Sequence, residues 1–252
     1  MIFVTGDTHT GWMERLNTAA FPEQKEMTKD DFVIILGDFG IWDNSKREKY
    51  GLDWLDKKSF TTLFIDGNHE NYDILDAMPV ENWNGGKVHK IRPSVIHLMR
   101  GQVYQISGKK FFAFGGAASH DISDGILDPQ DPDFKHKKRM LDKDPYSMYR
   151  VNHESWWERE LPNIEEMEEG RRNLEECRKQ VDFILTHSPS TSILQKMCGE
   201  EDSYSCDILT DYLEDLMQKV SYGHWLFGHM HVNQMFREER AICLYEQIVR
   251  IV

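Results

Sequence analysis

The sequence begins with MIFVTGDTH at residues 1–9, a mostly apolar run that stops at a glycine and is followed by an aspartate and a histidine. Similar apolar runs that end at polar, glycine-rich segments cover residues 1–5, 32–36, 61–65, 110–114, 181–186 and 223–227. Short runs of this kind are typical of strands that are buried on both faces. Segments with helical periodicity at 12–20 and 46–58 lie between the first runs. This alternation predicts an α/β fold made of packed layers.

The middle of the chain contains further short strand patterns at 87–91, 95–99 and 102–106, which predict a second, more antiparallel sheet. Residues 119–144 are polar and rich in proline, so we expect a loop there, followed by helices at 151–160 and 164–179. These features predict a single domain over residues 1–252 with a lid-like insertion at about 117–180. Apolar residues spaced by three and four from Ile208 to Val220 predict a helix that packs on the core.

Composition and charge restrict the classes of function. The 252 residues include 43 acidic and 30 basic side chains, and the net charge of -13 disfavours a surface that binds long nucleic acid. The four cysteines have no CxxC spacing, which is typical of a reducing compartment. We find no room for a signal peptide before the first strand and no run of about 18 apolar residues. We therefore expect a cytoplasmic protein without a membrane partner; the sequence does not indicate an oligomeric state.

Side chains that bind metals follow the predicted strands. Because strand ends meet at one edge of a sheet, we expect these residues to converge. They are Asp7 and His9 after the first strand, Asp38 after the second, Asn68 after the third, His187 after the strand at 181–186, and His229 and His231 after the strand at 223–227.

The ligand types indicate the metal chemistry. Carboxylate, imidazole and amide groups without thiolates suit Mn²⁺, Fe²⁺ or Zn²⁺, with Mn²⁺ as our first choice. Seven ligands exceed the need of one ion, whereas two ions roughly 3.5–4 Å apart would use them all. Such a pair suits hydrolysis of a phosphate ester, because a hydroxide that bridges the ions is available near neutral pH as the nucleophile.

The ordered motifs DTH (7–9), GD (37–38), GNHE (67–70), TH (186–187) and GHMH (228–231) resemble the calcineurin-like metallophosphoesterase superfamily. The resemblance implies a four-layer αββα sandwich of two mixed sheets, with the metal site at the carboxyl ends of the strands. It also implies that Asp7, His9 and His231 hold one ion, that Asn68, His187 and His229 hold the other, and that Asp38 bridges them. His69 would be the general acid, and Glu70 would orient its turn.

One departure from the family pattern concerns the second motif. Protein Ser/Thr phosphatases extend it to Gly-Asp-x-x-Asp-Arg, whereas this chain has GDFGIW at residues 37–42. The missing Asp and Arg weaken the protein phosphatase assignment and leave the partner of His69 open, with Asp66 and Asp43 as candidates.

The insertion is where we expect substrate specificity. His120 follows a strand and is placed to reach the edge of the metal site. Arg150 is a candidate for binding a phosphate, and Trp157 for stacking on a base or aryl group. The alternative for Trp157 is that it and Trp156 anchor the insertion to the core.

Three functions remain open from the sequence. The first is a phosphomonoesterase or phosphodiesterase that acts on a small molecule or a nucleotide. The second is an Mn²⁺-dependent nuclease, which the acidic composition disfavours. The third is a non-catalytic scaffold, which the presence of His69 disfavours.

Overall fold

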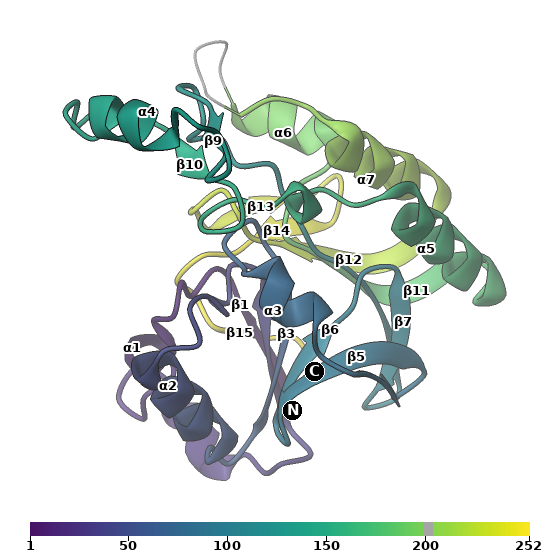
Figure 1. Ribbon diagram of the computed structural model, residues 1–252. Helices are drawn as coiled ribbons and strands as arrows, with labels where there is room; N and C mark the ends of the chain where they lie inside the picture. Colours follow the sequence, from purple (N-terminus) through teal and green to yellow (C-terminus); the bar gives the residue numbers. More distant parts are fainter. Residues whose placement is uncertain (199–203) are drawn as a thin grey trace.

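Two mixed β-sheets lie face to face and helices cover their outer faces in the computed structural model, which describes residues 1–198 and 204–252 (Figure 1). The predicted α/β fold with an αββα layer order is confirmed. The first sheet has the strand order β15 (Val249–Arg250), β1 (Ile2–Thr5), β2 (Phe32–Leu36), β3 (Thr61–Ile65), β6 (Val95–Leu98), β5 (Gly86–Arg92) and β4 (Val80–Trp83). Its central strands β1, β2, β3 and β6 are parallel.

The second sheet also has a parallel centre. Its strand order is β13 (Gln234–Phe236), β14 (Ala241–Cys243), β12 (Ser221–Phe227), β11 (Gln180–Thr186), β8 (Lys109–Phe114) and β7 (Gln102–Ile106). Only the edge pairs β13–β14 and β7–β8 are antiparallel. The prediction of a more antiparallel second sheet is therefore wrong. The strands of the middle segment divide between the two sheets, and a strand pattern does not state which neighbour a strand will pair with.

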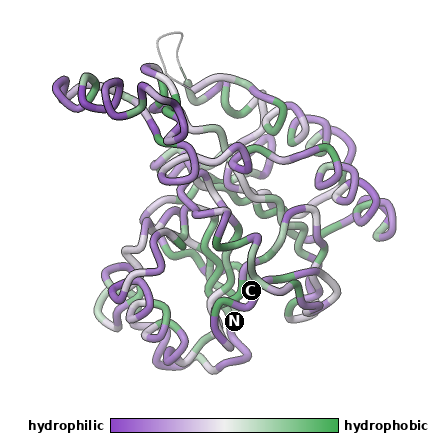
Figure 2. The backbone as a smooth tube through the Cα atoms, in the orientation of Figure 1, coloured by the Kyte–Doolittle hydropathy of each residue, from purple (hydrophilic) through white to green (hydrophobic). Residues whose placement is uncertain are grey.

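Alternating side chains of the central strands supply three apolar layers. Val4 and Leu63 point into the core between the sheets, where they meet Leu185 and other residues of the second sheet. Phe3 and Phe64, one position away from them, face the helices instead. This two-residue period explains why the strands are apolar throughout, since both faces are covered. In Figure 2 hydrophobic residues gather along the inner strands, whereas hydrophilic and hydrophobic residues alternate along the outer helices.

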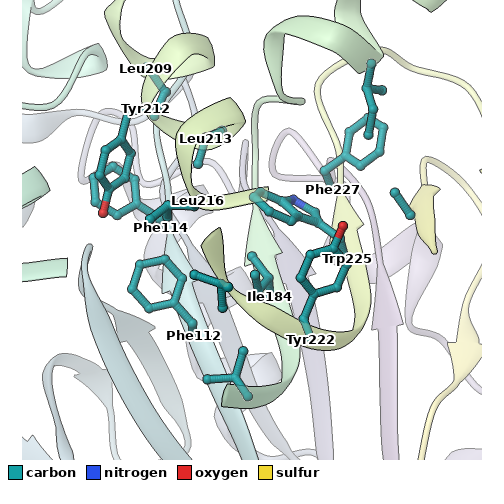
Figure 3. Close-up of a cluster of buried hydrophobic side chains, with 14 of the residues drawn as sticks. Phe112, Phe114, Ile184, Leu209, Tyr212, Leu213, Leu216, Tyr222, Trp225 and Phe227 are labelled. Carbon is teal, nitrogen blue, oxygen red and sulfur yellow. The ribbon is translucent and has the colours of Figure 1, made fainter. Parts of the chain in front are cut away.

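Helices pack on both outer faces. The first sheet is covered by α1 (Trp12–Arg15), α2 (Lys46–Asp56) and α3 (Tyr72–Asp76), and the second by α5 (Ile164–Glu176), α6 (Thr191–Met197) and α7 (Ile208–Lys219). Figure 3 shows Leu213 and Leu216 of α7 above Phe114 and Trp225 of the second sheet. The predicted helix at 208–220 is thereby confirmed. The helix predicted at 12–20 is shorter, because the Asn17 side chain accepts hydrogen bonds from the backbone at Ala19 and Ala20 and forms a turn.

The segment between β8 and β11 differs most from the prediction. The expected loop at 119–144 contains β9 (Ile126–Leu127) and α4 (Phe134–Leu141). The expected helix at 151–160 is replaced by β10 (Arg150–Val151), a bridge and the 3₁₀ turn η2 (Glu158–Glu160). Strand β10 pairs with β9 in a small separate sheet, and α4 extends away from the body of the protein (Figure 1). We retain as a proposal that residues 1–252 form one domain with this segment as its insertion.

None of the helices described is long and apolar enough to cross a membrane. No disulfide joins the cysteines of the described ranges, and Cys206 is exposed.

Candidate metal centre

The seven candidate ligands converge where the two sheets meet. Asp7 and His9 follow β1, Asp38 follows β2, and Asn68 follows β3, all in the first sheet. His187 follows β11, and His229 and His231 follow β12, in the second sheet. The structure therefore brings together residues that are up to 224 positions apart, from Asp7 to His231. This convergence was expected from the sequence.

A first group of four ligands is compact. Asp7, His9, Asp38 and His231 each offer one ligand atom, and these atoms lie within 4.8 Å of one another. His9 Nε2 is 3.2 Å from His231 Nε2, and His231 Nε2 is 3.1 Å from Asp7 Oδ2. Two imidazole nitrogens that face one another across carboxylates form an arrangement that suits a cation between them.

A second group lies on the other side of Asp38. His187 Nε2 is 3.3 Å from Asn68 Oδ1 and 3.3 Å from Asp38 Oδ1. The His229 ring centroid is 4.9 Å from that of His187. Asp38 Oδ2 faces the first group, at 3.6 Å from His9 Nε2. Each oxygen of the Asp38 carboxylate thus faces a different group of ligands.

Further contacts orient these ligands as metal binding requires. His187 Nδ1 donates to the carbonyl of Leu36 at 2.7 Å, which leaves Nε2 as the nitrogen that a metal ion would bind in place of a proton. Asp7 Oδ1 accepts from the backbone N–H of His229 at 3.0 Å. Asp7 Oδ2 is buried and, although His231 Nε2 lies 3.1 Å away, it accepts no aligned hydrogen bond among the described residues. A buried carboxylate oxygen without a donor is costly unless a cation binds it, so these residues fit a metal centre.

The backbone at the ligands is unusual. His9, Asp38, His229 and His231 have positive φ angles of 44°, 45°, 66° and 49°. Residues other than glycine rarely adopt this region, and such strain gathers at functional sites. Four of the seven candidate ligands share it, which supports a functional reason for these turns.

The glycines beside the ligands provide space for ligands from other strands. A Cβ atom on Gly37 would lie 2.2 Å from His187 Nδ1, and one on Gly67 would lie 2.2 Å from Asp38 Oδ1. Both distances are far shorter than a van der Waals contact. This explains why glycines and metal-type ligands recur together in the sequence.

Glu70 fixes the relative positions of two ligand turns. Its buried carboxylate accepts from the backbone N–H groups of Phe39 and Gly40 after β2, and from Gly67 after β3. The supporting role predicted for Glu70 matches these contacts.

The partner of His69 comes from the insertion. Arg150 Nη2 lies 3.2 Å from His69 Nε2, and because a guanidinium only donates, Nε2 accepts. Arg150 is buried and forms a bidentate ion pair with Asp121. Neither Asp66 nor Asp43 has the predicted role: Asp66 pairs with Arg100, and Asp43 accepts from the backbone of Ser45.

Charges shift several pKa values in the site. Burial alone would raise the pKa of Asp38, but His187 holds it well below its usual range. Burial by itself would lower the pKa of His187. The Asp38 and Asp7 carboxylates outweigh this effect and raise the pKa to about 10. For His69, burial and the Arg150 guanidinium lower the pKa to about 4, despite the nearby Asp38. Asp38 is thus ionised and His69 is neutral at pH 7 when the site holds no substrate.

Two other predicted residues have different surroundings. His120 lies near the second group, with its ring centroid 6.0 Å from that of His229, and its buried Nδ1 has no hydrogen bond among the described residues. Trp157 is 1% exposed, and its Nε1 donates to Asp73 at 2.9 Å. These contacts match the anchoring alternative for Trp157 and not a stacking surface.

Trp42 is a residue of the site that we did not predict from the sequence. Its half-buried indole lies 6.2 Å from the His69 ring and 5.6 Å from the Trp157 ring, measured between centroids. It follows Asp38 by four positions in GDFGIW. That proximity is the signal that could have identified it.

Comparison with known proteins identifies the matching family. A family model described as calcineurin-like phosphoesterase matches residues 1–233. A lariat debranching enzyme of Schizosaccharomyces pombe is 22% identical over 82% of this chain and 44% of its own length. Lariat debranching enzyme A of Xenopus laevis is 22% identical over 92% of this chain and 42% of its own. The chain therefore spans less than half the length of these curated relatives.

A solved structure also resembles this one. The phosphopantetheinyl hydrolase of Mycobacterium tuberculosis aligns over 97% of this chain and 87% of its own, with 15% identity and a TM-score of 0.45.

Proposed function

Because the chain belongs to the calcineurin-like phosphoesterase family, we propose that it hydrolyses a phosphate monoester or diester of a small molecule or nucleotide at a centre of two divalent metal ions. Asp7, His9 and His231 would hold one ion, Asn68, His187 and His229 the other, and Asp38 would bridge them. The position of Asp38 is the observation that carries the proposal, since its two oxygens face the two ligand groups at 3.6 and 3.3 Å.

The bound ions would supply a hydroxide nucleophile and would neutralise charge on the phosphate. We propose Mn²⁺ as the metal, with Fe or Zn as alternatives, because the donor set combines oxygen and imidazole nitrogen without thiolate.

On the side of the phosphate opposite the hydroxide nucleophile, Arg150 would bind the substrate and His69 would protonate it. An imidazolium and a guanidinium 3.2 Å apart repel, so an anion that takes over the hydrogen bonds of both groups would favour the protonated form of His69. A phosphate fits this requirement, because it accepts hydrogen bonds from both groups. Arg150 would then bind the phosphate through its fork, and His69 would protonate the leaving oxygen. His120 would contact the phosphate beside the second ligand group.

A metal and substrate assay tests this function. We expect the purified chain to retain Mn²⁺ and to hydrolyse p-nitrophenyl phosphate or bis-p-nitrophenyl phosphate, and the preferred ester distinguishes monoesterase from diesterase. Asp38→Asn should lose Mn²⁺ and reduce turnover by more than about 10²–10³-fold, the loss seen when one transition-state donor is removed. The exposed Asp30→Asn is the matched control and should retain both properties. A chain that binds no divalent ion and hydrolyses neither ester would contradict the proposal.

A nuclease is the second candidate, because both curated relatives described above are named lariat debranching enzymes. The net charge of -13 opposes binding of a long polyanion. Cleavage of an RNA or DNA oligonucleotide with Mn²⁺ faster than of bis-p-nitrophenyl phosphate would favour it.

A further inference from the structure

Two cavities meet at Trp42. One, of about 190 Å³, is lined by His9, Thr10, Gly40, Trp42 and His69, so it opens on the first ligand group and on the general acid. The other, of about 220 Å³, shares Thr10 and Trp42 with the first. It extends along α1 and α2, where Met13, Glu14 and Arg47 line it. The two cavities therefore lie side by side, the first beside His69 and the second beside α2.

The backbone of Trp42 is fixed by two hydrogen bonds, and its indole packs against neighbouring rings. Its backbone N–H donates to Glu48 Oε2 at 2.7 Å, and its carbonyl accepts from Asn71 Nδ2 at 2.8 Å. The ring meets the buried Trp157 edge-on, with an angle of 80° between the planes. A ring that is already fixed loses little conformational entropy when a ligand stacks on it.

The position of Trp42 determines which part of a substrate it meets. The general acid lies on the side from which the leaving group departs. Since the His69 ring is 6.2 Å from the indole, a leaving group protonated by His69 would lie beside Trp42. The second cavity is then the space into which the rest of that group extends.

The charges in the second cavity indicate a neutral leaving group. Glu14, Asp43 and Glu48 contribute three carboxylates, against the single guanidinium of Arg47. Such surroundings repel an additional phosphate but can accept hydrogen bonds from hydroxyl and amino groups. Glu48 is already bound to the backbone of Trp42 and Asp43, and Asp43 Oδ1 accepts from the backbone of Ser45. The Glu14 carboxylate and the second oxygen of Asp43 face the cavity for a ligand.

We propose that these cavities form a leaving-group site for a neutral nucleoside, whose base stacks on Trp42 and whose ribose faces the carboxylates of Glu14 and Asp43. This inference rests on the proposed function and specifies its substrate as an ester of a nucleoside. It also disfavours a leaving group that is part of a longer nucleic acid, because that group would carry further phosphates.

Inhibition by the leaving group tests the site. With Mn²⁺ and whichever p-nitrophenyl ester is hydrolysed, we measure the inhibition constants of adenosine and of ribose, which lacks the base. We expect adenosine to bind more tightly than ribose in the unmodified chain. Trp42→Ala should raise the adenosine constant by about 5- to 150-fold, the range for one base stacked on an aromatic ring, and Trp42→Phe should raise it less. The ribose constant should change less than about twofold, because ribose makes no stacking contact.

The controls separate stacking from other effects. The matched variant is Trp54→Ala, which should leave both constants unchanged. Trp54 is a half-buried tryptophan on α2 that makes a cation–π contact with Lys58. Equal inhibition by adenosine and ribose in the unmodified chain would overturn the proposal, as would an equal rise of both constants in Trp42→Ala. If neither ester is hydrolysed, the proposed function fails by itself, and calorimetric binding of adenosine and ribose still decides whether the site exists.

Discussion

The strand ends and the insertion contribute to the same site in different ways. The seven candidate ligands and His69 lie at the ends of strands whose backbones are fixed by both sheets. Arg150 comes from a two-stranded ribbon outside these sheets, and its position depends on ion pairs with Asp121 and on the carbonyl of Ser155. The rigid part would hold the metal ions, and the insertion would complete the side that faces the substrate.

This division suggests how the protein could change its substrate without losing its metal centre. Sites on regular elements are positioned more precisely than sites on loops, whereas loops tolerate more sequence change. If the division is correct, substitutions at the strand ends should have larger effects on the reaction than substitutions in the insertion.

The largest effect is expected for His69→Ala. Loss of a positioned general acid should reduce the turnover of an alkyl phosphate by about 10²–10⁴-fold, and that of p-nitrophenyl esters less, because p-nitrophenolate leaves without a proton. We measure kcat for both esters in the variant and in the unmodified chain. The Mn²⁺ content, measured in parallel, should stay unchanged.

His136→Ala is the control for this substitution, since His136 is an exposed histidine on α4. Equal losses for the alkyl and the aryl ester would argue against proton donation by His69. A loss of Mn²⁺ would instead assign it to the metal centre.

A smaller effect is expected for Arg150→Ala. A hydrogen bond to a charged group contributes about 1.5–3 kcal/mol, so kcat/KM should fall about 10- to 150-fold. Arg150→Lys should recover only part of this, because lysine lacks the planar fork that binds a phosphate at two points. The thermal midpoint is measured in parallel, because Arg150 is buried and its loss leaves Asp121 without its partner.

Arg139, exposed on α4 of the same insertion, supplies the control variant Arg139→Ala. If Arg150→Ala lowered kcat/KM as much as His69→Ala does, the comparison between the strand ends and the insertion would break down.

The strand ends were predictable because their signal is local. A short apolar run, a glycine and a ligand such as Gly37-Asp38 specify a buried strand, a close approach and a chemical group within a few residues. The pairing of strands was less predictable, because nothing in residues 87–106 states that β5 and β6 join one sheet and β7 the other.

The insertion was poorly predicted because its structure depends on distant contacts. Residues 151–160 have helical periodicity, but Trp157 is buried against Trp42 and Asp73, and Arg150 binds the carbonyl of Ser155. These contacts override helix propensity. The partner of His69 was missed for the same reason, since Arg150 and His69 are far apart in the sequence.

The smallest effect concerns the hydrogen bonds that join Ser119 and Glu160 of the insertion to the metal centre. Glu160 Oε2 accepts from the backbone N–H and the hydroxyl of Ser119, and Ser119 Oγ in turn accepts from Asn68 Nδ2 at 3.4 Å. Burial raises the pKa of Glu160 to about 8, against an ordinary value of 4.5. The folded protein therefore keeps this proton above the pH at which the unfolded chain loses it.

The sign of the pH dependence follows from that difference. Between pH 4.5 and about 8 the folded state binds more protons than the unfolded state, so the contribution of Glu160 to stability is complete below this window and is lost as the pH rises through it. Glu160→Gln carries no proton to lose. At about 1.36 kcal/mol for each pKa unit, the difference between 4.5 and about 8 sets an upper limit of about 5 kcal/mol. Because water can reach an ionised carboxylate after local relaxation, we expect about 1 kcal/mol of this, equivalent to about 2–4 °C in Tm for a domain of this size. The Tm of Glu160→Gln should therefore rise by this amount, relative to the Tm of the unmodified chain, when the pH is raised from 5 to 9. All other groups titrate equally in the two proteins. If the Tm difference between Glu160→Gln and the unmodified chain were the same at pH 5 and at pH 9, Glu160 would be ionised at both pH values. The insertion would then be held by an anion.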